Sequence, residues 1–87
     1  MLDRTEEIIG LSVYTPAGIL VGKVSDIRFD LENRCADGLI VDDVNPAVAE
    51  YNIVVNIPFS WISAIGDVVL LKRFPERILR DGTLQGL

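Results

Sequence analysis

Residues 10–30, GLSVYTPAGILVGKVSDIRFD, are the stretch of sequence that decides the fold. Two β-prone segments flank residues 15–18, where proline presets its own φ and glycine accepts a positive φ, so a tight hairpin is predicted. In the second strand the apolar positions change parity near Ser25 and Asp26, which predicts a β-bulge. Gly22 permits a bend or a close approach by a neighbouring backbone. A long, coiled strand of this kind is typical of a small barrel.

A second segment, near the carboxyl end, fits the closing strands of the same barrel. In residues 57–62, IPFSWI, the proline marks the end of a strand, because it has no N–H to donate to a neighbouring strand. Residues 64–71, AIGDVVLL, place a glycine-aspartate turn before a final strand. Further strands are expected over residues 38–41 and 53–57. The sequence therefore predicts an all-β domain, a small barrel that is closed or partly open.

We expect the chain to divide into an amino-terminal cap (residues 1–9), the barrel (10–72) and a carboxyl-terminal tail (73–87). In the cap, Thr5 precedes two glutamates and predicts a short capped turn. In the tail, Pro75 suits the first turn of a helix and Gly82 suits its end, so a short helix is predicted there.

Two polar connections separate the predicted strands. Residues 30–37 are expected to form a loop. Residues 42–52 contain an Asn-Pro step and are expected to form a longer connection.

The apolar content exceeds what a lone barrel of this size needs to fill its interior. Of 87 residues, 49% are hydrophobic and 30 are Ile, Leu or Val. Several predicted strands carry apolar residues at both odd and even positions. In a sheet with one solvent-exposed face, apolar and polar residues would alternate along each strand. We therefore expect an apolar outer stripe on the barrel, made of Ile40, Val54, Val69 and Leu71. Its cover is either the tail, through Phe74, Ile78 and Leu79, or a second protein subunit.

Acidic residues concentrate in the middle of the chain. Residues 26–50 hold seven acids and two arginines, a surplus of five that equals the formal net charge of −5. Such a surplus disfavours nucleic acid, whose phosphates need basic neutralisation. The acidic surplus is consistent either with a solvated rim that keeps an apolar protein in solution or with a contact surface for a basic partner. The residues of this acidic rim are Asp37, Asp42, Asp43 and Glu50.

The residue types needed for catalysis are scarce. The chain has no histidine, which removes the commonest general base and metal ligand. The lone Cys35 has no histidine partner, and the adjacent Asp42 and Asp43 lack the spaced carboxylates of a calcium loop. We expect no enzyme activity, no metal and no cofactor.

The cysteine count and the hydropathy pattern predict a location. One cysteine permits no intrachain disulfide, which is usual in a reducing compartment. The first ten residues carry three acids and no signal-peptide core, and no apolar run approaches the ~20 residues of a spanning helix. We expect a cytoplasmic protein without direct membrane insertion.

The two deciding segments together resemble the PRC-barrel family. The resemblance covers about residues 8–72 and rests on the following positions: Gly10, Val13, Thr15, Gly18, Gly22, Lys23, Val24, Asp26, Ile27, and residues 57–59 and 65–70. It implies a six-stranded barrel used for protein contacts, with no catalytic residue. Members of the family include the photosynthetic reaction-centre H subunit and the carboxyl-terminal domain of a ribosome maturation factor. The chain lacks the membrane helix of the first and the RNA-processing-factor domain of the second.

A chain that consists of the barrel alone is similar to the stand-alone archaeal branch of the family. That resemblance implies homodimers or mixed dimers with a paralogous barrel, and a cell-division adaptor that binds a SepF-like protein. The leading hypothesis is therefore a non-catalytic, dimeric scaffold or adaptor. The alternative is a ribosome-assembly factor that grips a basic ribosomal protein through the acidic rim.

Overall fold

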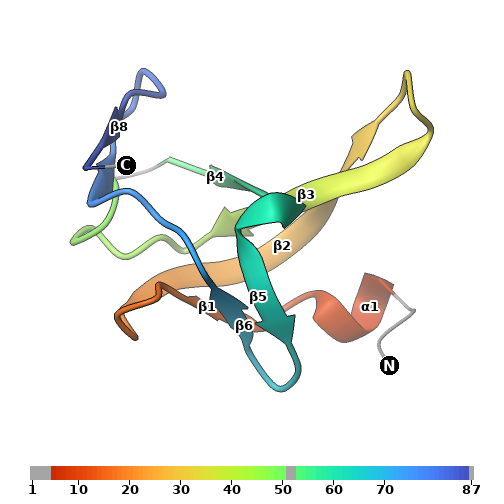
Figure 1. The fold of residues 1–87 in the computed structure, drawn as a ribbon, viewed down its shortest axis with the longest axis horizontal. Coiled ribbons are helices and arrows are strands. Elements are labelled where there is room, and N and C mark those ends of the chain that lie inside the picture. The colour runs from red at the N-terminus through yellow and green to blue at the C-terminus, as the bar shows by residue number, and fades with distance from the viewer. Residues whose placement is uncertain (1–4, 51–52, 87) are drawn as a thin grey trace.

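A single six-stranded sheet, strongly curved, forms the body of the protein (Figure 1). The computed structural model describes residues 5–50 and 53–86. Its elements are α1 (Thr5–Ile8), β1 (Ser12–Tyr14), β2 (Leu20–Asp30), β3 (Cys35–Asp42), β4 (Val55–Pro58), the 3-10 turn η1 (Phe59–Trp61), β5 (Ile62–Ile65), β6 (Val69–Leu71), β7 (Arg77–Ile78) and β8 (Leu84–Gln85).

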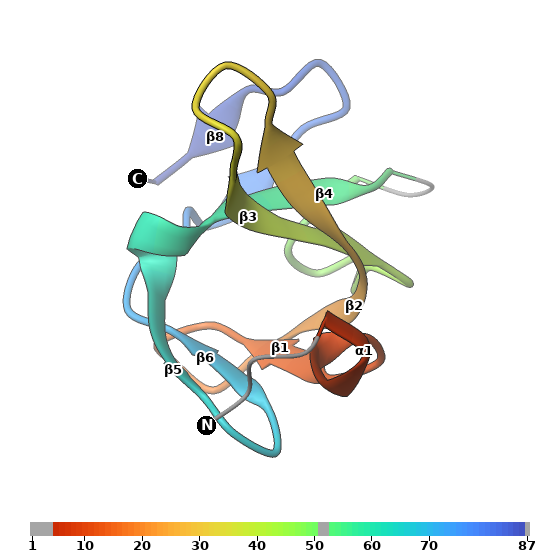
Figure 2. The same ribbon diagram turned by 90° about the vertical axis from the view of Figure 1, so that its right-hand side faces the viewer.

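The strand order β4-β3-β2-β1-β6-β5 places consecutive strands β4 and β5 at the two edges of the sheet. Neighbouring strands are antiparallel except β1 and β6, which are parallel. Because η1 joins the two edge strands directly, the sheet curls round on itself (Figure 2). No backbone ladder joins β4 to β5 in residues 5–50 and 53–86. The predicted all-β, six-stranded architecture is confirmed, but a closed barrel is not seen.

The turn between β1 and β2 is built as the sequence predicts. The Gly18 N–H donates to the Thr15 carbonyl at 2.9 Å, and the Ile19 N–H donates to Thr15 Oγ1 at 3.1 Å. Gly18 has a φ of 82°, a conformation that costs glycine nothing. The buried Thr15 hydroxyl therefore ties the hairpin together.

Two glycines let β3 approach its neighbours closely. A Cβ at Gly22 would lie 2.5 Å from the Asp42 carbonyl oxygen, and one at Gly38 would lie 2.5 Å from the Ile57 carbonyl oxygen. The register of β2 against β3 also shifts between Val24 and Asp26. This bulge and the approach at Gly22 are the two features predicted for the long strand.

The core lies on the concave face of the sheet. Its fully buried side chains are Leu39, Ile57, Val13, Val21, Val24, Val41, Val55 and Val69. In β4 and β6 buried and more exposed residues alternate, as the two-residue period of a strand requires, whereas in β2 the buried Val21 and Val24 lie three residues apart. At about 0.8 kcal/mol for each buried CH₂ group, these aliphatic side chains supply most of the favourable free energy of folding.

The predicted helix in the tail is wrong, because residues 77–85 form the hairpin β7–β8. The Ile78 N–H donates to the Val48 carbonyl, and the Ile78 carbonyl accepts from the Glu50 N–H, both at 2.9 Å. This pairing holds the tail extended. Gly82, with a φ of 88°, serves the hairpin turn, where the Thr83 N–H donates to Asp81 Oδ1 at 2.9 Å. A positive-φ glycine fits either a helix end or a turn, so the sequence signal was ambiguous.

The loop predicted over residues 30–37 is shorter than expected. Strand β2 continues to Asp30 and β3 begins at Cys35, so only residues 31–34 form the turn. At the amino terminus the predicted short turn corresponds to α1. The predicted connection over residues 42–52 includes two residues that lie outside the described part of the chain.

Candidate interaction surfaces

The residues that the structure describes contain no group of three or more His, Cys, Asp or Glu side chains able to hold a metal ion. Cys35 is exposed and lies at the start of β3, not in a turn as the sequence suggested. Across the same residues, no helix is long and apolar enough to cross a bilayer. The candidate residues that remain from the sequence analysis are the apolar and acidic ones.

Only half of the predicted outer stripe lies on the outside of the sheet. Val54 is 57% exposed and Ile40 is half-buried, as expected for an outer face. Val69 and Leu71 are 0% and 3% exposed, so their assignment to the outer stripe is wrong. The outward-facing residue of β6 is Leu70. The run from 68 to 71 is entirely apolar, so its parity could not be assigned from sequence.

The tail residues predicted to cover the stripe pack against their own chain. The ring of Phe74 meets Trp61 edge-on, with centroids 6.1 Å apart and an interplanar angle of 81°. Ile78 is buried in the core and pairs with Ala49 in an isolated bridge. Leu79 is half-buried. The tail therefore folds back in cis, one of the two covers that the sequence allowed.

A groove of about 290 Å³ separates the edge strand β4 from the hairpin β7–β8. We call it the tail groove; its lining residues are Ile53, Val54, Val55, Asn56, Pro58, Trp61, Ile78, Leu79, Arg80, Gly82 and Leu84. Apolar side chains dominate this lining, and the one charged residue in it is Arg80. A second groove, about 340 Å³ in volume, is lined by Ile19, Phe74 and the acidic Glu76, among others.

The outer end of the β2–β3 hairpin projects from the body of the sheet (Figure 1). We call residues 28–37 the arm. Beyond the pair Arg28 and Gly38, β2 and β3 pair only with each other, because β1 pairs with β2 up to Lys23 and β4 pairs with β3 only from Gly38 onward. The arm is therefore a two-stranded ribbon without a third strand to cover it.

The arm carries the two most exposed large hydrophobic residues of the described chain. Phe29 is 63% exposed and Leu31 is 87% exposed. Phe29 lies in β2, two residues after Ile27, whose side chain packs against the core, and Leu31 lies in the turn that follows β2. The sequence analysis used the change of parity at Ile27, Phe29 and Leu31 to predict a bulge, and it did not assign these residues to a contact surface.

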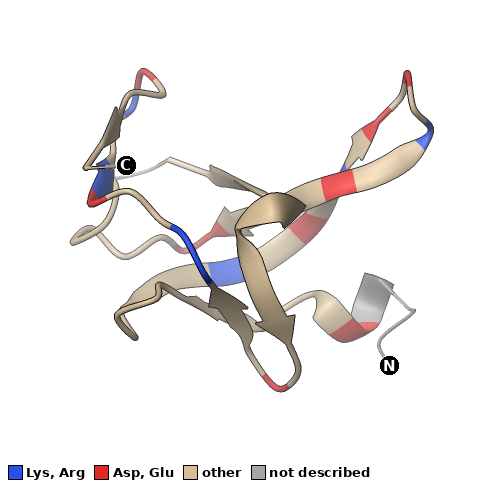
Figure 3. Cartoon of the chain, in the orientation of Figure 1, with Lys and Arg blue, Asp and Glu red and all other residues tan. Residues whose placement is uncertain are grey.

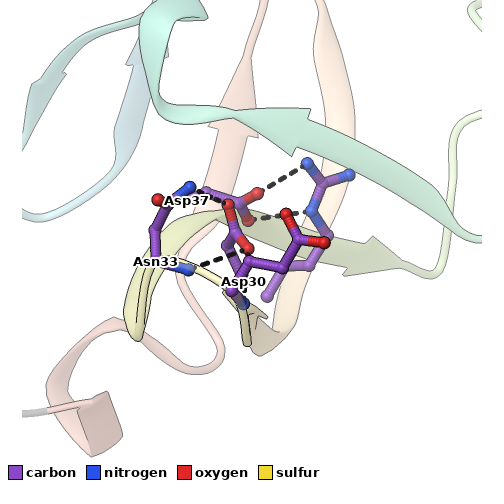
Figure 4. A network of polar contacts seen from close by, with 5 residues as sticks. Asp30, Asn33 and Asp37 are labelled. Carbon is purple, nitrogen blue, oxygen red and sulfur yellow. Dashed lines mark hydrogen bonds and ion pairs between the residues drawn. The ribbon is translucent and has the colours of Figure 1, made fainter.

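Polar contacts fix the shape of the arm (Figure 4). The Arg28 guanidinium donates two hydrogen bonds to the Asp37 carboxylate, at 2.9 and 3.0 Å. Asp30 accepts from the Glu32 N–H at 3.0 Å and from the Asn33 side-chain amide at 2.6 Å. These bonds close the turn.

The same contacts shift two carboxyl pKa values. The hydrogen bond from Arg28 lowers the pKa of Asp37, and the Asn33 amide lowers the pKa of Asp30. A carboxyl whose pKa is lower in the folded than in the unfolded chain stabilises the folded arm at any pH above its unfolded-state pKa. This stabilisation is lost as the pH falls through the folded-state pKa.

We expect the arm to open locally in acid before the sheet unfolds. The protection factors of the amides in residues 28–37, which correct the exchange rate for its own dependence on pH, should stay level from neutral pH down to the ordinary carboxyl range near ~4 and then fall as Asp30 and Asp37 become protonated. Asp37→Asn should speed exchange in the arm already at neutral pH, while Asp67→Asn, at the far β5–β6 turn, should not. Equal exchange rates in all three proteins would contradict the assigned role of the ion pair.

The predicted acidic rim does not form one cluster. Asp37 belongs to the arm and is paired with Arg28, whereas Asp42 and Asp43 lie at the other end of β3. Asp42 lies five residue steps along the extended strand from Asp37, a distance of about 17 Å. Glu50 forms an ion pair with Arg80 at 3.6 Å. The prediction of a single acidic rim rested on how close these residues are in the sequence, and they are not grouped in the folded structure.

A curved, six-stranded sheet whose two edge strands are joined by a short turn defines a small, barrel-like all-β domain. Comparison with known protein families matches residues 2–78 to the PRC-barrel domain. Since the match covers most of the chain, the protein belongs to the PRC-barrel family, as its sequence motifs suggest. A search of curated proteins found no match.

Proposed function

We propose that the protein is a non-catalytic interaction module that associates with a second copy of itself or with a related barrel. One observation carries this proposal: the described residues leave ten large hydrophobic side chains at least one-third exposed on a chain of only 87 residues. They are Ile9, Ile19, Leu20, Phe29, Leu31, Val54, Phe59, Ile65, Leu70 and Leu84. Two groups among them, Phe29 with Leu31 on the arm and Val54 with Leu84 in the tail groove, offer apolar surface that another protein can cover.

The family membership supports the same function at a coarser level, because PRC-barrel domains are generally non-catalytic interaction domains. An adaptor role in archaeal cell division, with a SepF-like protein as the second partner, rests on the family resemblance alone and is part of this proposal. The acidic residues are dispersed, so no specific observation favours the ribosome-assembly alternative.

We expect the wild-type protein to self-associate at micromolar concentrations. Val54→Asp places a charge on an exposed apolar position, so it should leave the fold intact and weaken association by at least about tenfold. Light scattering over a concentration series measures both proteins, with Ser63→Asp as a control at an exposed polar position. A strictly monomeric wild-type protein over this range would overturn the self-association proposed here.

A further inference from the structure

The tip of the arm and the hairpin β7–β8, which forms one wall of the tail groove, lie at opposite ends of the long axis of the molecule (Figure 1). The arm ends in the turn at residues 31–34, while the groove lies beside the hairpin β7–β8. An arm therefore reaches a tail groove only in another molecule. The two surfaces also differ in shape, since one projects and the other is hollow.

The net charges of the arm and of the hairpin β7–β8 are opposite in sign, although each carries both acidic and basic residues (Figure 3). The arm, residues 28–37, contains three acids and two arginines, a net charge of −1, whereas residues 77–85 contain two arginines and one acid, a net charge of +1. Arg80 lines the groove itself, although Glu50 partly neutralises it at 3.6 Å. Opposite net charges of this kind favour encounter of the two ends and disfavour arm against arm.

The apolar chemistry also matches. The arm presents Phe29 and Leu31 on a ribbon that is already fixed by the bonds of Arg28 and Asp30, so little conformational entropy is lost on docking. The tail groove offers Trp61, Leu79 and Leu84 as partly exposed apolar walls. Its volume of about 290 Å³ suits a few side chains and not a larger ligand. The second groove fits less well, because Glu76 would face the acidic arm.

We propose that copies of this chain assemble head to tail, with the arm of one copy seated in the tail groove of the next. This inference deepens the proposed function by naming the two surfaces that meet. Contact between two different patches is heterologous, so it generates an open chain or a closed ring and not an isolated two-fold dimer. Part of the attraction is ionic, so assembly weakens as salt concentration rises.

The test uses one variant for each surface. Leu31→Asp disables the arm at an 87% exposed position, and Leu84→Asp disables the groove at a 41% exposed position. Substitutions at such exposed sites change stability little, so both variants should fold. Each variant alone should lose self-association by at least about tenfold, measured by sedimentation velocity.

Mixing the two variants gives the decisive result. Leu31→Asp keeps an intact groove and Leu84→Asp keeps an intact arm, so an equimolar mixture should form 1:1 dimers and nothing larger. If circular dichroism shows that either variant is unfolded, Phe29→Ser replaces the arm variant and Val54→Asp replaces the groove variant. Ile19→Asp, in the second groove, is the control and should assemble like the wild type.

Three outcomes would overturn head-to-tail assembly. They are a mixture that stays monomeric, a variant that assembles like the wild type, and loss of assembly in Ile19→Asp but not in Leu84→Asp. Each of these leaves the general interaction function standing if the wild-type protein still self-associates. A monomeric wild type would overturn this inference and the proposed self-association together.

Discussion

Val69→Asp is expected to unfold the protein. Val69 is fully buried, and its strand β6 pairs with β1 on one side and β5 on the other. A carboxylate there would lie among the aliphatic side chains of the core, because no basic group belongs to that cluster. Burying an unpaired charge costs about 4 kcal/mol or more, a large part of the total stability of a domain this small.

The matched control is Leu70→Asp, at the adjacent position on the same strand. Leu70 is 45% exposed and points away from the core, so the new carboxylate remains in water. This substitution should cost no more than about 1 kcal/mol, mainly through the weak strand preference of aspartate. Urea unfolding followed by circular dichroism measures both variants. Similar midpoints for the two would show that the inward and outward faces of β6 have been assigned wrongly.

Gly38→Ala is expected to give the second large loss of stability. The new Cβ would lie 2.5 Å from the Ile57 carbonyl oxygen and 3.3 Å from the Pro58 Cα, which are backbone atoms of β4. A side chain could rotate away, but relief here requires the edge strand to move. We expect a loss of about 3 kcal/mol in the free energy of unfolding.

Gly66→Ala provides the comparison for this glycine. Nothing lies within 4 Å of a Cβ built at Gly66, and its φ is not in the left-handed region. The substitution should therefore be neutral, or stabilising by up to about 1 kcal/mol, because alanine restricts the unfolded chain. If Gly38→Ala unfolds at the same urea concentration as Gly66→Ala, the close contact of β3 with β4 is not as the structure describes.

The parts of the fold that the sequence predicted correctly depend on local chemistry. The turn at residues 15–18 needs proline and glycine, and the bulge near Ser25 is visible as a change of parity within one strand. Both signals lie within a few neighbouring residues. The order of the motifs along the chain also indicated the PRC-barrel family, and that resemblance implied the six strands.

The incorrect predictions concern features that depend on contacts between residues distant in the sequence. The tail is extended since Ile78 pairs with Val48 and Glu50, a partnership that propensity cannot reveal. The face of Val69 is decided by its register against Val13. Likewise, Asp37 and Asp42 share a short sequence segment but lie at opposite ends of a strand. The arm was missed because the change of parity at Ile27, Phe29 and Leu31 was interpreted only as a bulge, and residues 30–37 were expected to form a loop.

The parallel pairing of β1 with β6 has a consequence for how the molecule folds. It joins Val13 to Val69, so the sheet gains its fifth and sixth strands only after most of the polypeptide has been synthesised. Closing such a long loop early is entropically unfavourable, and topologies rich in distant contacts reach the native state slowly. The β2–β3 ribbon, whose partners are adjacent in sequence, is the natural nucleus, and β6 docks late.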